Sequence, residues 1–295
     1  KDVSMAAVTN DYQLLDSGNM KKLERLGPYL LVRPSLAAVW EPRLPETEWR
    51  KADGVYTRDT GEDGGKWTFH RKVQREFDVL YGNLHFHIRL TNFGHMGLFA
   101  EQIDNWDWLR DNIRQRMKAT NDRNLYVLNL FGYTGVGTQA LSAFGPVTHV
   151  DASKKSVAQA RANAELAGIA DRPVRWIVDD AAKFTAREVR RGKRYDGIIL
   201  DPPKFGRGPE GEVWRLEEGL PRLLADCRAL LDADSRFLFL TVYAVRMSSL
   251  ALIGLMDEIF RDLPGKLEHG DLAVREEGPG GRLLPTAIFA RWSND

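Results

Sequence analysis

The sequence predicts an α/β protein with an open, seven-stranded, mostly parallel sheet whose last strand is antiparallel, preceded by a small β-rich domain. From residue 125 onward, short apolar runs alternate with segments of helical apolar spacing, which is typical of a parallel sheet covered by helices on both faces. Before residue 95, prolines and glycines separate short β-type runs. We therefore expect a β-rich domain over residues 1–95, which contributes to substrate recognition, and an α/β domain over residues 96–295.

The composition limits the class of protein. A hydrophobic content of 43% with 28% charged residues is in the globular range. The net charge of +1 neither indicates nor excludes a nucleic-acid partner, because a local basic patch is sufficient. The single cysteine fits a reducing compartment, so we expect a cytoplasmic location. The most apolar run, residues 237–245, is too short to cross a bilayer, and we expect no membrane partner.

The N-terminal part contains six short β-type runs: residues 12–15, 29–32, 36–40, 67–69, 77–80 and 84–90. Period-2 alternation in the last of them places His85 and His87 on one strand face. No carboxylate or cysteine lies at ligand spacing nearby in the sequence, so we interpret this face as a half-polar surface and predict no metal.

A helix over residues 101–118 is predicted to lead into the alternating part, because its apolar residues recur at helical spacing. Strands are expected at 125–131, 147–150, 174–178, 195–200 and 236–243, and helices at 136–144, 154–167, 181–190, 216–231 and 249–262. In the tail, residues 272–275 and 286–291 have only a Gly-Pro-Gly-Gly connection between them. This pattern predicts a terminal hairpin, and therefore an antiparallel last strand.

The first strand of the alternating part ends in a glycine-rich turn. Gly132, Gly135 and Gly137 fall within six residues, and a helical pattern follows. Glycine lets the backbone turn sharply and approach a ligand without a Cβ in the way, and a following helix presents its N-terminal N–H groups. Because open parallel sheets bind ligands at the carboxyl ends of their strands, the pattern predicts a cofactor-binding turn.

The next three strands end in Asp151, in Asp179-Asp180 and in Asp201-Pro202-Pro203. Asp151 follows Gly132 at about the spacing at which a strand-end carboxylate accepts hydrogen bonds from a ribose diol, although a helix N-cap is the alternative role. We expect Asp180 to accept from an adenine amine and Asp179 to cap the following helix.

A nicotinamide dinucleotide is the alternative cofactor, since Gly135, Gly137 and Ala140 satisfy the form G-x-G-x-x-A. These glycines begin four residues after the apolar run ends, which gives a poorer strand-to-turn geometry. An NAD-linked dehydrogenase would also leave Asp180 and the Asp-Pro-Pro segment unexplained.

Taken together, residues 128–135, 150–153, 160–163 and 196–205 resemble the class I, Rossmann-like S-adenosylmethionine-dependent methyltransferases, and in particular the bacterial 23S ribosomal-RNA methyltransferases that act on cytosine C5 or guanine N7. The resemblance covers about residues 94–245, and residues 97–102 look like the family segment that closes over the cofactor. It implies S-adenosyl-L-methionine as cofactor and RNA as partner. The cofactor-binding residues implied are Gln102, Phe131, Gly132, Thr134, Gly135, Asp151, Ala152, Asp180, Ala181 and Asp201.

The cysteine content bears on the target atom. Carbon-5 of cytosine is not nucleophilic until a cysteine thiolate adds to the ring. The only cysteine, Cys227, falls in a leucine stripe at helical spacing, and the family's cytosine branch carries its cysteine where this chain has residues 241–244. We therefore expect methylation of a nitrogen or other heteroatom of an RNA base. Guanine N7 has a free lone pair, so its methylation requires no general base in the enzyme. A protein or small-molecule acceptor is the alternative.

The segment Asp201-Pro202-Pro203-Lys204-Phe205 is predicted to be catalytic. Asp201 and the Pro202 carbonyl would orient the acceptor, Phe205 would stack on it, and Lys204 or Arg207 would hold a phosphate. A rigid turn that ends a strand is the alternative explanation.

A basic run lies between the third and fourth strands, and it consists of Lys183, Arg187, Arg190, Arg191, Lys193 and Arg194. It is either a phosphate-contacting surface or a solvated helix face. The sequence carries no signal for the oligomeric state.

Overall fold

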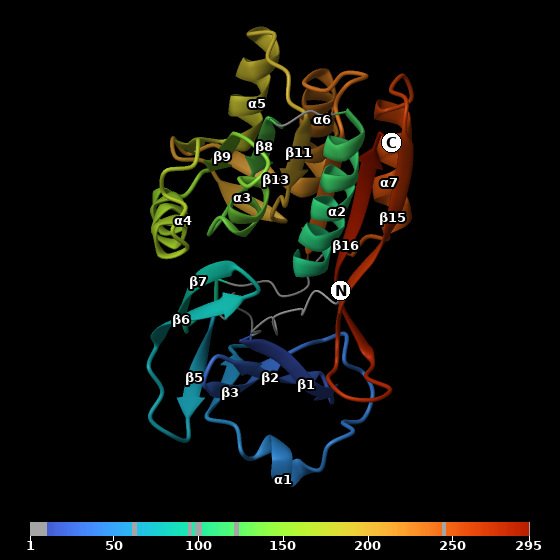
Figure 1. Cartoon of the computed structure of the whole chain (residues 1–295). Helices are drawn as coiled ribbons and strands as arrows, with labels where there is room; N and C mark the ends of the chain where they lie inside the picture. Colours follow the sequence, from blue (N-terminus) through green and yellow to red (C-terminus); the bar gives the residue numbers. More distant parts are fainter. Residues whose placement is uncertain are drawn as a thin grey trace, which may run out of the picture. The chain divides into compact units, whose positions relative to one another are not determined.

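The computed structural model in Figure 1 describes residues 11–60, 64–93, 96–97, 102–120, 124–243 and 246–294. Contacts divide the chain into two compact units: Lys1–Glu101 with Ala273–Pro285, and Gln102–Leu272 with Thr286–Asp295. The tip of the terminal hairpin is thus grouped with the N-terminal unit. The division into domains at residues 95 and 96 stays a prediction.

The N-terminal unit contains a five-stranded sheet in the order β1-β2-β3-β4-β5, and only β3 and β4 pair in parallel. Its strands are β1 (Tyr12–Gly18), β2 (Lys21–Leu26), β3 (Tyr29–Pro34), β4 (Gly54–Arg58) and β5 (Gly65–Phe69). A separate hairpin is formed by β6 (Glu76–Tyr81) and β7 (Leu84–Arg89), and α1 (Glu46–Trp49) is one turn long.

The strand predicted over residues 36–40 is wrong, and β2 and β4 were not predicted. Residues 36–40 come after β3 in the chain and run alongside the turn between β1 and β2. There, Asn19 N donates to Trp40 O and Met20 N donates to Ala38 O, both at 2.8 Å. Two apolar side chains that suggested a strand, Leu36 and Val39, are 72% and 77% exposed. In β2 the charged residues obscure the alternation.

The N-terminal unit buries several charged groups. Glu24 is fully buried, and its carboxylate accepts from Arg33 Nε at 2.7 Å and from the Tyr12 hydroxyl at 2.6 Å. Lys22 Nζ lies 3.1 Å from the same carboxylate. Burial alone would raise the pKa of Glu24, but Arg33 and Lys22 override it and lower the pKa from 4.5 to about 2.

A second buried ionic cluster joins the hairpin tip to β1. Arg282 donates to Glu276 Oε2 through Nε at 2.9 Å, and through Nη2 to Asp16 Oδ1 at 3.0 Å and to Ser17 O at 2.7 Å. The Ser17 hydroxyl donates to Glu276 at 2.6 Å. Asp16 and Glu276 are 1% and 2% exposed, so two buried carboxylates share the Arg282 guanidinium, and Arg43 Nη1 lies a further 3.7 Å from Glu276 Oε2.

The second unit is built on a seven-stranded sheet in the order β10-β9-β8-β11-β14-β16-β15. The strands are β8 (Val127–Leu130), β9 (Val147–Asp151), β10 (Val174–Val178), β11 (Gly197–Leu200), β14 (Phe237–Tyr243), β15 (Lys266–Arg275) and β16 (Leu283–Ser293). The first five in this order pair in parallel, and β16 is antiparallel to β14. This confirms the predicted fold class.

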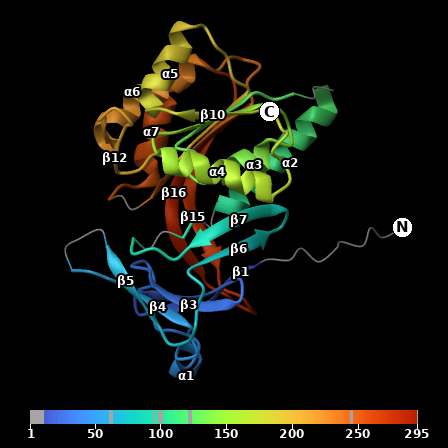
Figure 2. The same ribbon diagram turned by 90° about the vertical axis from the view of Figure 1, so that its left-hand side faces the viewer.

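Helices cover both faces of this sheet. In Figure 2, α2 (Gln102–Thr120), α3 (Val136–Leu141) and α4 (Lys154–Leu166) lie on one side, and α5 (Ala181–Arg190), α6 (Leu216–Ala229) and α7 (Ser249–Ile259) lie on the other. Contacts agree with two layers, because α2 packs on α3, α5 on α6 and α6 on α7. The central strands are therefore buried on both faces, which explains their continuous apolar sequences.

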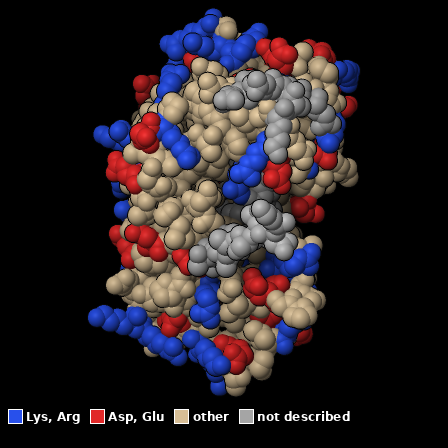
Figure 3. Space-filling view, in the orientation of Figure 1, with Lys and Arg blue, Asp and Glu red and all other residues tan. Residues whose placement is uncertain are grey.

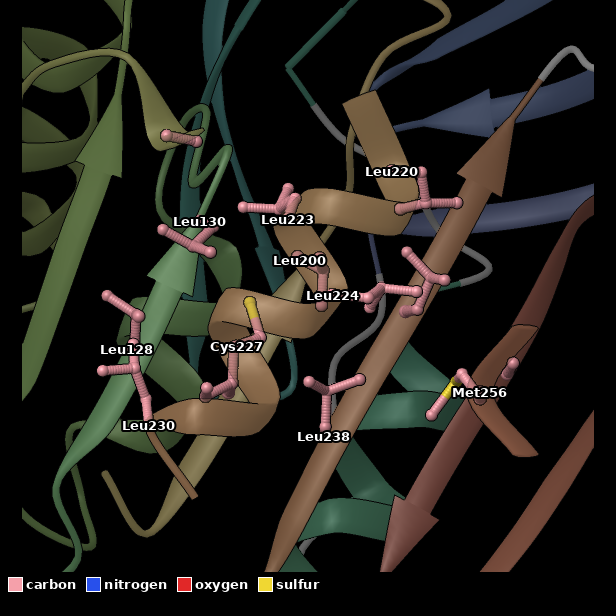
Figure 4. Close-up of a cluster of buried hydrophobic side chains, with 14 of the residues drawn as sticks. Leu128, Leu130, Leu200, Leu220, Leu223, Leu224, Cys227, Leu230, Leu238 and Met256 are labelled. Carbon is pink, nitrogen blue, oxygen red and sulfur yellow. The ribbon is translucent and has the colours of Figure 1, made fainter. Parts of the chain in front are cut away.

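Helix α6 provides the largest part of the apolar core. Figure 4 shows its side chains Leu220, Leu223, Leu224 and Cys227, together with Leu230 at its C-cap, facing residues of β8, β11 and β14. All five are at most 3% exposed. No helix in the described parts of the chain is both long enough and apolar enough to span a membrane.

Candidate active site

The parallel strands bring the predicted site segments to one edge of the sheet. Since β10, β9, β8, β11 and β14 are neighbours in this order, their carboxyl ends form a row. Along this row stand Asp179 and Asp180, then Asp151, then the turn after Leu130, then Asp201. Four segments that are separated by up to 70 residues in the chain thus end beside one another.

The turn after β8 has an alternating left-handed backbone. Phe131, Tyr133 and Gly135 have φ of 56°, 48° and 86°, and only the last is a glycine. Left-handed conformations at residues other than glycine cost roughly 1–3 kcal/mol each and persist where the surroundings over-determine them. Here Gly132 N donates to Val150 O at 3.0 Å and Gly135 N to Gly132 O at 2.9 Å.

Helix α4 secures the other side of the turn. Asn163, which is fully buried, donates through Nδ2 to Thr134 O at 2.9 Å. A Cβ on Gly135 would lie 3.0 Å from the Cβ of Ala160, so this glycine also allows close packing of the turn on the helix. Thr134 is itself 6% exposed. The turn is therefore fixed by both β9 and α4.

Gly132 is required by packing as well as by the turn. A Cβ there would lie 2.4 Å from Cε1 of His149, so the imidazole ring occupies the space that any other side chain would need. We expected this glycine to allow a close approach of the cofactor; the structure adds the His149 ring, on β9, as a separate reason.

A buried polar network supports this ring. Asn129 Nδ2 donates to Thr138 Oγ1 at 3.0 Å, and Thr138 Oγ1 lies 2.8 Å from His149 Nδ1. Burial lowers the pKa of His149 to about 4, and a backbone hydrogen bond with Tyr133 only partly opposes it. The imidazole is therefore neutral near pH 7. These three residues come from β8, α3 and β9, so no local sequence pattern marks the network.

Asp151 is oriented by two backbone N–H groups. Its Oδ2 accepts from Tyr133 N at 3.0 Å and its Oδ1 from Ser153 N at 2.8 Å. The N-cap of α4 is Ser153, which excludes capping as the role of Asp151. Burial raises the pKa of Asp151, and the two backbone hydrogen bonds oppose that shift. Because each carboxylate oxygen accepts up to two hydrogen bonds, the group keeps acceptor capacity. The neighbouring Ala152 is half-buried.

The helix cap predicted for Asp179 is wrong. Asp180 is the N-cap of α5 and accepts from Lys183 N at 2.9 Å, whereas Asp179 pairs with Arg187. The reason is spatial: Arg187 lies two helical turns into α5, where its side chain reaches back to Asp179. The adenine contact of Asp180 stays a prediction. Ala181, at the start of α5, is 5% exposed and packs in the core.

The Asp-Pro-Pro segment continues into a small hairpin that the sequence did not predict. Strand β12 (Phe205–Arg207) pairs antiparallel with β13 (Val213–Arg215). Trp214 Nε1 donates to Pro203 O at 2.7 Å, and Leu216 N donates to Lys204 O at 3.0 Å. The Trp214 ring also lies 5.4 Å from the Phe131 ring, which links the acceptor segment to the turn.

The predicted Gln102 lies at the start of α2, where its Nε2 donates to the Tyr243 hydroxyl at 3.0 Å. Tyr243 ends β14, next to β11 in the sheet, and was not among the predicted site residues. The segment expected to close over the cofactor falls mostly outside the described residues, since 98–101 are not among them.

The basic run separates into two groups. Lys183 pairs with Glu210 at 3.2 Å and with Glu212. Arg190, Arg191, Lys193 and Arg194 are exposed at the end of α5 that precedes β11, and Figure 3 shows basic side chains gathered over this end of the helix. Because α5 begins after the carboxyl end of β10, this second group lies at the opposite edge of the sheet from the site.

The histidine pair on β7 has carboxylate neighbours that the sequence did not reveal. The register with β6 places Asp78 Oδ1 at 2.7 Å from His87 Nδ1, and Glu76 Oε2 at 3.2 Å from His87 Nε2. Even so, no group of three ligand-type side chains suited to a metal occurs among the described residues.

Comparison with solved structures identifies the family. A crystal structure of a SAM-dependent methyltransferase from Agrobacterium tumefaciens is 42% identical, covers 98% of this chain and 92% of its own, and superposes with a TM-score of 0.91. This chain belongs to the SAM-dependent methyltransferases. A structure from Streptococcus mutans, at 16% identity over 99% of this chain and 77% of its own, has a TM-score of 0.70 and supports the fold alone.

Curated relatives match the methyltransferase over part of their length. Ribosomal RNA large subunit methyltransferase I of Aeromonas salmonicida is 35% identical over 127 residues, or 42% of this chain. Ribosomal RNA large subunit methyltransferase K/L of Pseudoalteromonas atlantica is 25% identical over 252 residues, or 78% of this chain. The chain spans only 29% and 34% of these two relatives. No protein-family model matches the sequence.

The residues of the methyltransferase fit its cofactor, S-adenosyl-L-methionine. Residues 131–137 contain no lysine or arginine, which suits a cofactor without phosphate. The half-buried carboxylate of Asp151, already oriented by two N–H groups, is an acceptor suited to vicinal hydroxyls. The individual cofactor contacts all stay predictions: those of Gln102, Phe131, Gly132, Thr134, Gly135, Asp151, Ala152, Asp180, Ala181 and Asp201.

The methyltransferase has no cysteine available for covalent catalysis. Cys227 is fully buried in the leucine cluster, and burial raises the pKa of its thiol far above the usual range. Thr241, Val242 and Tyr243 occupy the end of β14, the position at which the resemblance places the cysteine of the cytosine-modifying branch. Cys227 therefore cannot supply the thiolate that adds to a pyrimidine ring in cytosine C5 methylation.

Proposed function

We propose that this methyltransferase transfers a methyl group to a ring or exocyclic nitrogen of an RNA base, in ribosomal RNA of the large subunit. The observation that carries the proposal is the position of Asp201-Pro202-Pro203 at the end of β11, next to the cofactor turn on β8. The partial similarity to ribosomal-RNA methyltransferases I and K/L supports RNA as the substrate class. Ribosomal RNA would place the enzyme in the cytoplasm.

The bound cofactor supplies an electrophilic methyl group on a sulfonium. The acceptor nitrogen would provide the electron pair of the new N–CH3 bond, and the electron pair of the S–CH3 bond would stay on the departing thioether. An exocyclic amine would then lose one proton to solvent, whereas a ring nitrogen with a free lone pair loses none. The protein's contribution is mainly alignment, because an in-line displacement needs the nucleophile held at the correct distance and angle. Asp201 and the Pro202 carbonyl, both hydrogen-bond acceptors, would hold the N–H edge of the base.

The turn and the acceptor segment are connected, which supports this assignment. The carbonyls of Pro203 and Lys204 accept from Trp214 and Leu216, so the segment after Asp201 is fixed in place. The Trp214 ring, 6% exposed, lies between this segment and Phe131 of the turn. A target held by Asp201 would therefore be positioned relative to the cofactor by rigid contacts.

The test uses S-adenosylmethionine with a labelled methyl group and unmodified 23S ribosomal RNA transcribed in vitro, with a protein extract as the competing acceptor. We expect label in the RNA, and a rate reduced roughly 100-fold or more by Asp201→Asn. Asp257→Asn, on the exposed side of α7, is the matched control and should leave the rate unchanged. Label in protein with none in RNA would contradict the proposal.

A further inference from the structure

The small hairpin after the Asp-Pro-Pro segment has two different faces. Gly206 and Trp214 are paired with each other and point to the core side, where Trp214 is 6% exposed. Residues on the other face are Phe205, Arg207, Val213 and Arg215, and all four are exposed. We refer to these four residues as the hairpin platform.

The platform combines exposed apolar surface with positive charge. Phe205 and Val213 are 51% and 55% exposed. Phe205 is paired directly with Arg215 across the hairpin, and the guanidinium carbons of Arg215 and Arg207 lie 5.8 and 6.0 Å from the centre of its ring. Three flat groups, one aromatic and two cationic, therefore share one face of a two-stranded sheet.

The hairpin is held in place at both ends. At its base, Trp214 Nε1 donates to Pro203 O at 2.7 Å. At its tip, Lys183 of α5 pairs with Glu210 and Glu212, which lie in the connection between the two strands. Glu212 also accepts from Glu210 N at 2.9 Å. The acidic residues of the tip are thus engaged by a lysine, while the platform carries only neutral and positive side chains.

We propose that the hairpin platform binds an unpaired nucleotide adjacent to the target base, with the base stacked on Phe205 and its phosphates held by Arg207 and Arg215. The inference rests on the proposed RNA substrate. Aromatic rings and arginine guanidinium planes are the groups on which unstacked RNA bases pack, and arginine also holds phosphates. One carboxylate lies beside the platform: Glu218 Oε1, at the start of α6, is 3.9 Å from Arg215 Nε, beyond hydrogen-bond distance, so the exposed guanidinium still has donors for a phosphate.

Phe205 thereby receives a different role from the stacking on the acceptor base that the sequence predicts. Asp201 is half-buried at the strand end, whereas Phe205 lies four residues further along and faces outward with two arginines. It therefore serves the neighbouring nucleotide, and the target base is left to Asp201. Substrates with single-stranded flanks should be preferred, because a base within a duplex does not expose its face.

The test measures binding of fluorescent 12-nucleotide RNA, single-stranded or annealed to its complement, to the full chain saturated with S-adenosylhomocysteine. Stacking on one aromatic is worth a roughly five- to 150-fold change in affinity, so Phe205→Ala should weaken single-strand binding within that range. Arg215→Gln should weaken it and lower the slope of log affinity against log salt by about 0.7. Arg215→Lys should restore the salt slope but not the full affinity.

Two further variants keep the result decisive. Val213→Asp removes no predicted contact but places a negative charge on the platform, and it should also weaken single-strand binding. Arg222→Gln, on an exposed position of α6 whose side chain is 81% accessible, is the matched control and should bind as the wild type does. Unchanged S-adenosylhomocysteine affinity in calorimetry shows that each variant is folded.

The outcomes separate this inference from the proposed function. If the wild type methylates 23S ribosomal RNA while Phe205→Ala, Arg215→Gln and Val213→Asp all bind single-stranded RNA as tightly as the control, the platform is not the nucleotide site. If the wild type binds S-adenosylmethionine but methylates no RNA, the proposed function itself fails. Loss of binding confined to the platform variants, in an enzyme that methylates RNA, supports both.

Discussion

The two units of the chain bury different kinds of side chains. Among its described residues, the N-terminal unit encloses three carboxylates that are at most 2% exposed, Asp16, Glu24 and Glu276, each with a basic partner. The second unit is organised around an apolar cluster centred on α6. The difference follows from architecture, since a parallel sheet covered by helices on both faces supplies a large apolar core, whereas a five-stranded sheet with charged strands does not.

This contrast predicts different responses to charge. A buried ion pair contributes little relative to an apolar replacement, but removing one partner leaves an uncompensated charge. The N-terminal unit should therefore be sensitive to single charge removals and to acid. The second unit should respond to loss of apolar volume at any pH. The described part of the second unit also buries polar groups, but fewer of them are charged. Glu188, 1% exposed, accepts from the Tyr195 hydroxyl at 2.8 Å, while Asn129, Thr138 and His149 lie beside the cofactor turn.

The largest effect is expected for Arg282→Met. It leaves the buried carboxylates of Asp16 and Glu276 without their shared cation, and should lower the free energy of unfolding of the N-terminal unit by about 3–5 kcal/mol at pH 7. Urea denaturation followed by tryptophan fluorescence measures this. Arg275→Met, which loses one hydrogen bond to Gly281 O, is the control on the same hairpin. If Arg282→Met and Arg275→Met lower the free energy of unfolding equally, Arg282 is not the cation that stabilises the buried carboxylates.

Glu24→Gln should cost somewhat less, and its cost should depend on pH. The folded pKa of about 2 lies below the ordinary value of 4.5, so the ionised carboxylate contributes stability above pH 4.5 that is lost as the pH falls towards 2. The difference between the folded and the ordinary pKa of Glu24 corresponds to about 3 kcal/mol of folding stability. In denaturation curves between pH 3 and 7, the free energy of unfolding of the wild type should fall towards that of the Glu24→Gln variant as the pH decreases.

Leu224→Ala provides the contrast from the second unit. Leu224 is fully buried in the α6 cluster, and its truncation should cost about 2–5 kcal/mol. Unlike the cost of Glu24→Gln, this cost should be the same at pH 4 and at pH 7. A strong pH dependence would mean that the two units are not stabilised by different interactions.

Gly132→Ala should have a smaller effect on stability but a clear effect on cofactor binding. The added Cβ meets the His149 ring, so we expect a cost of about 1–3 kcal/mol and a loss of S-adenosylmethionine affinity of roughly tenfold or more. Calorimetry of the double variant with His149→Ala is the control. If removing the ring restores none of the affinity, the turn is not positioned by His149.

The smallest effect is expected for Cys227→Ala. The thiol is fully buried among leucines, so its loss should cost about 1 kcal/mol in stability through a small cavity. Methyl transfer to RNA should continue at the rate of the wild type, measured at a temperature where both proteins are folded. If the variant is folded and binds the cofactor but transfers no methyl group, Cys227 takes part in catalysis and the prediction is wrong.

The sequence by itself determined the features that depend on local pattern. The alternation of apolar runs and helical spacing predicted the seven-stranded sheet, and the Gly-Pro-Gly-Gly connection predicted the antiparallel last strand. The glycine-rich turn and the aspartates at strand ends could be placed at one edge of the sheet because parallel strands share a direction. The leucine spacing around Cys227 was enough to predict its burial.

Only the tertiary structure decided features that depend on contacts between distant segments. The packing of His149 against Gly132, the pairing of Asp179 with Arg187 and the β12–β13 hairpin all depend on which side chains meet in space. The apolar run at 36–40 was interpreted as a strand because local pattern does not reveal that the chain turns there. Periodicity is set by neighbours within a few residues, whereas these contacts are set by the order of strands and the packing of helices on them.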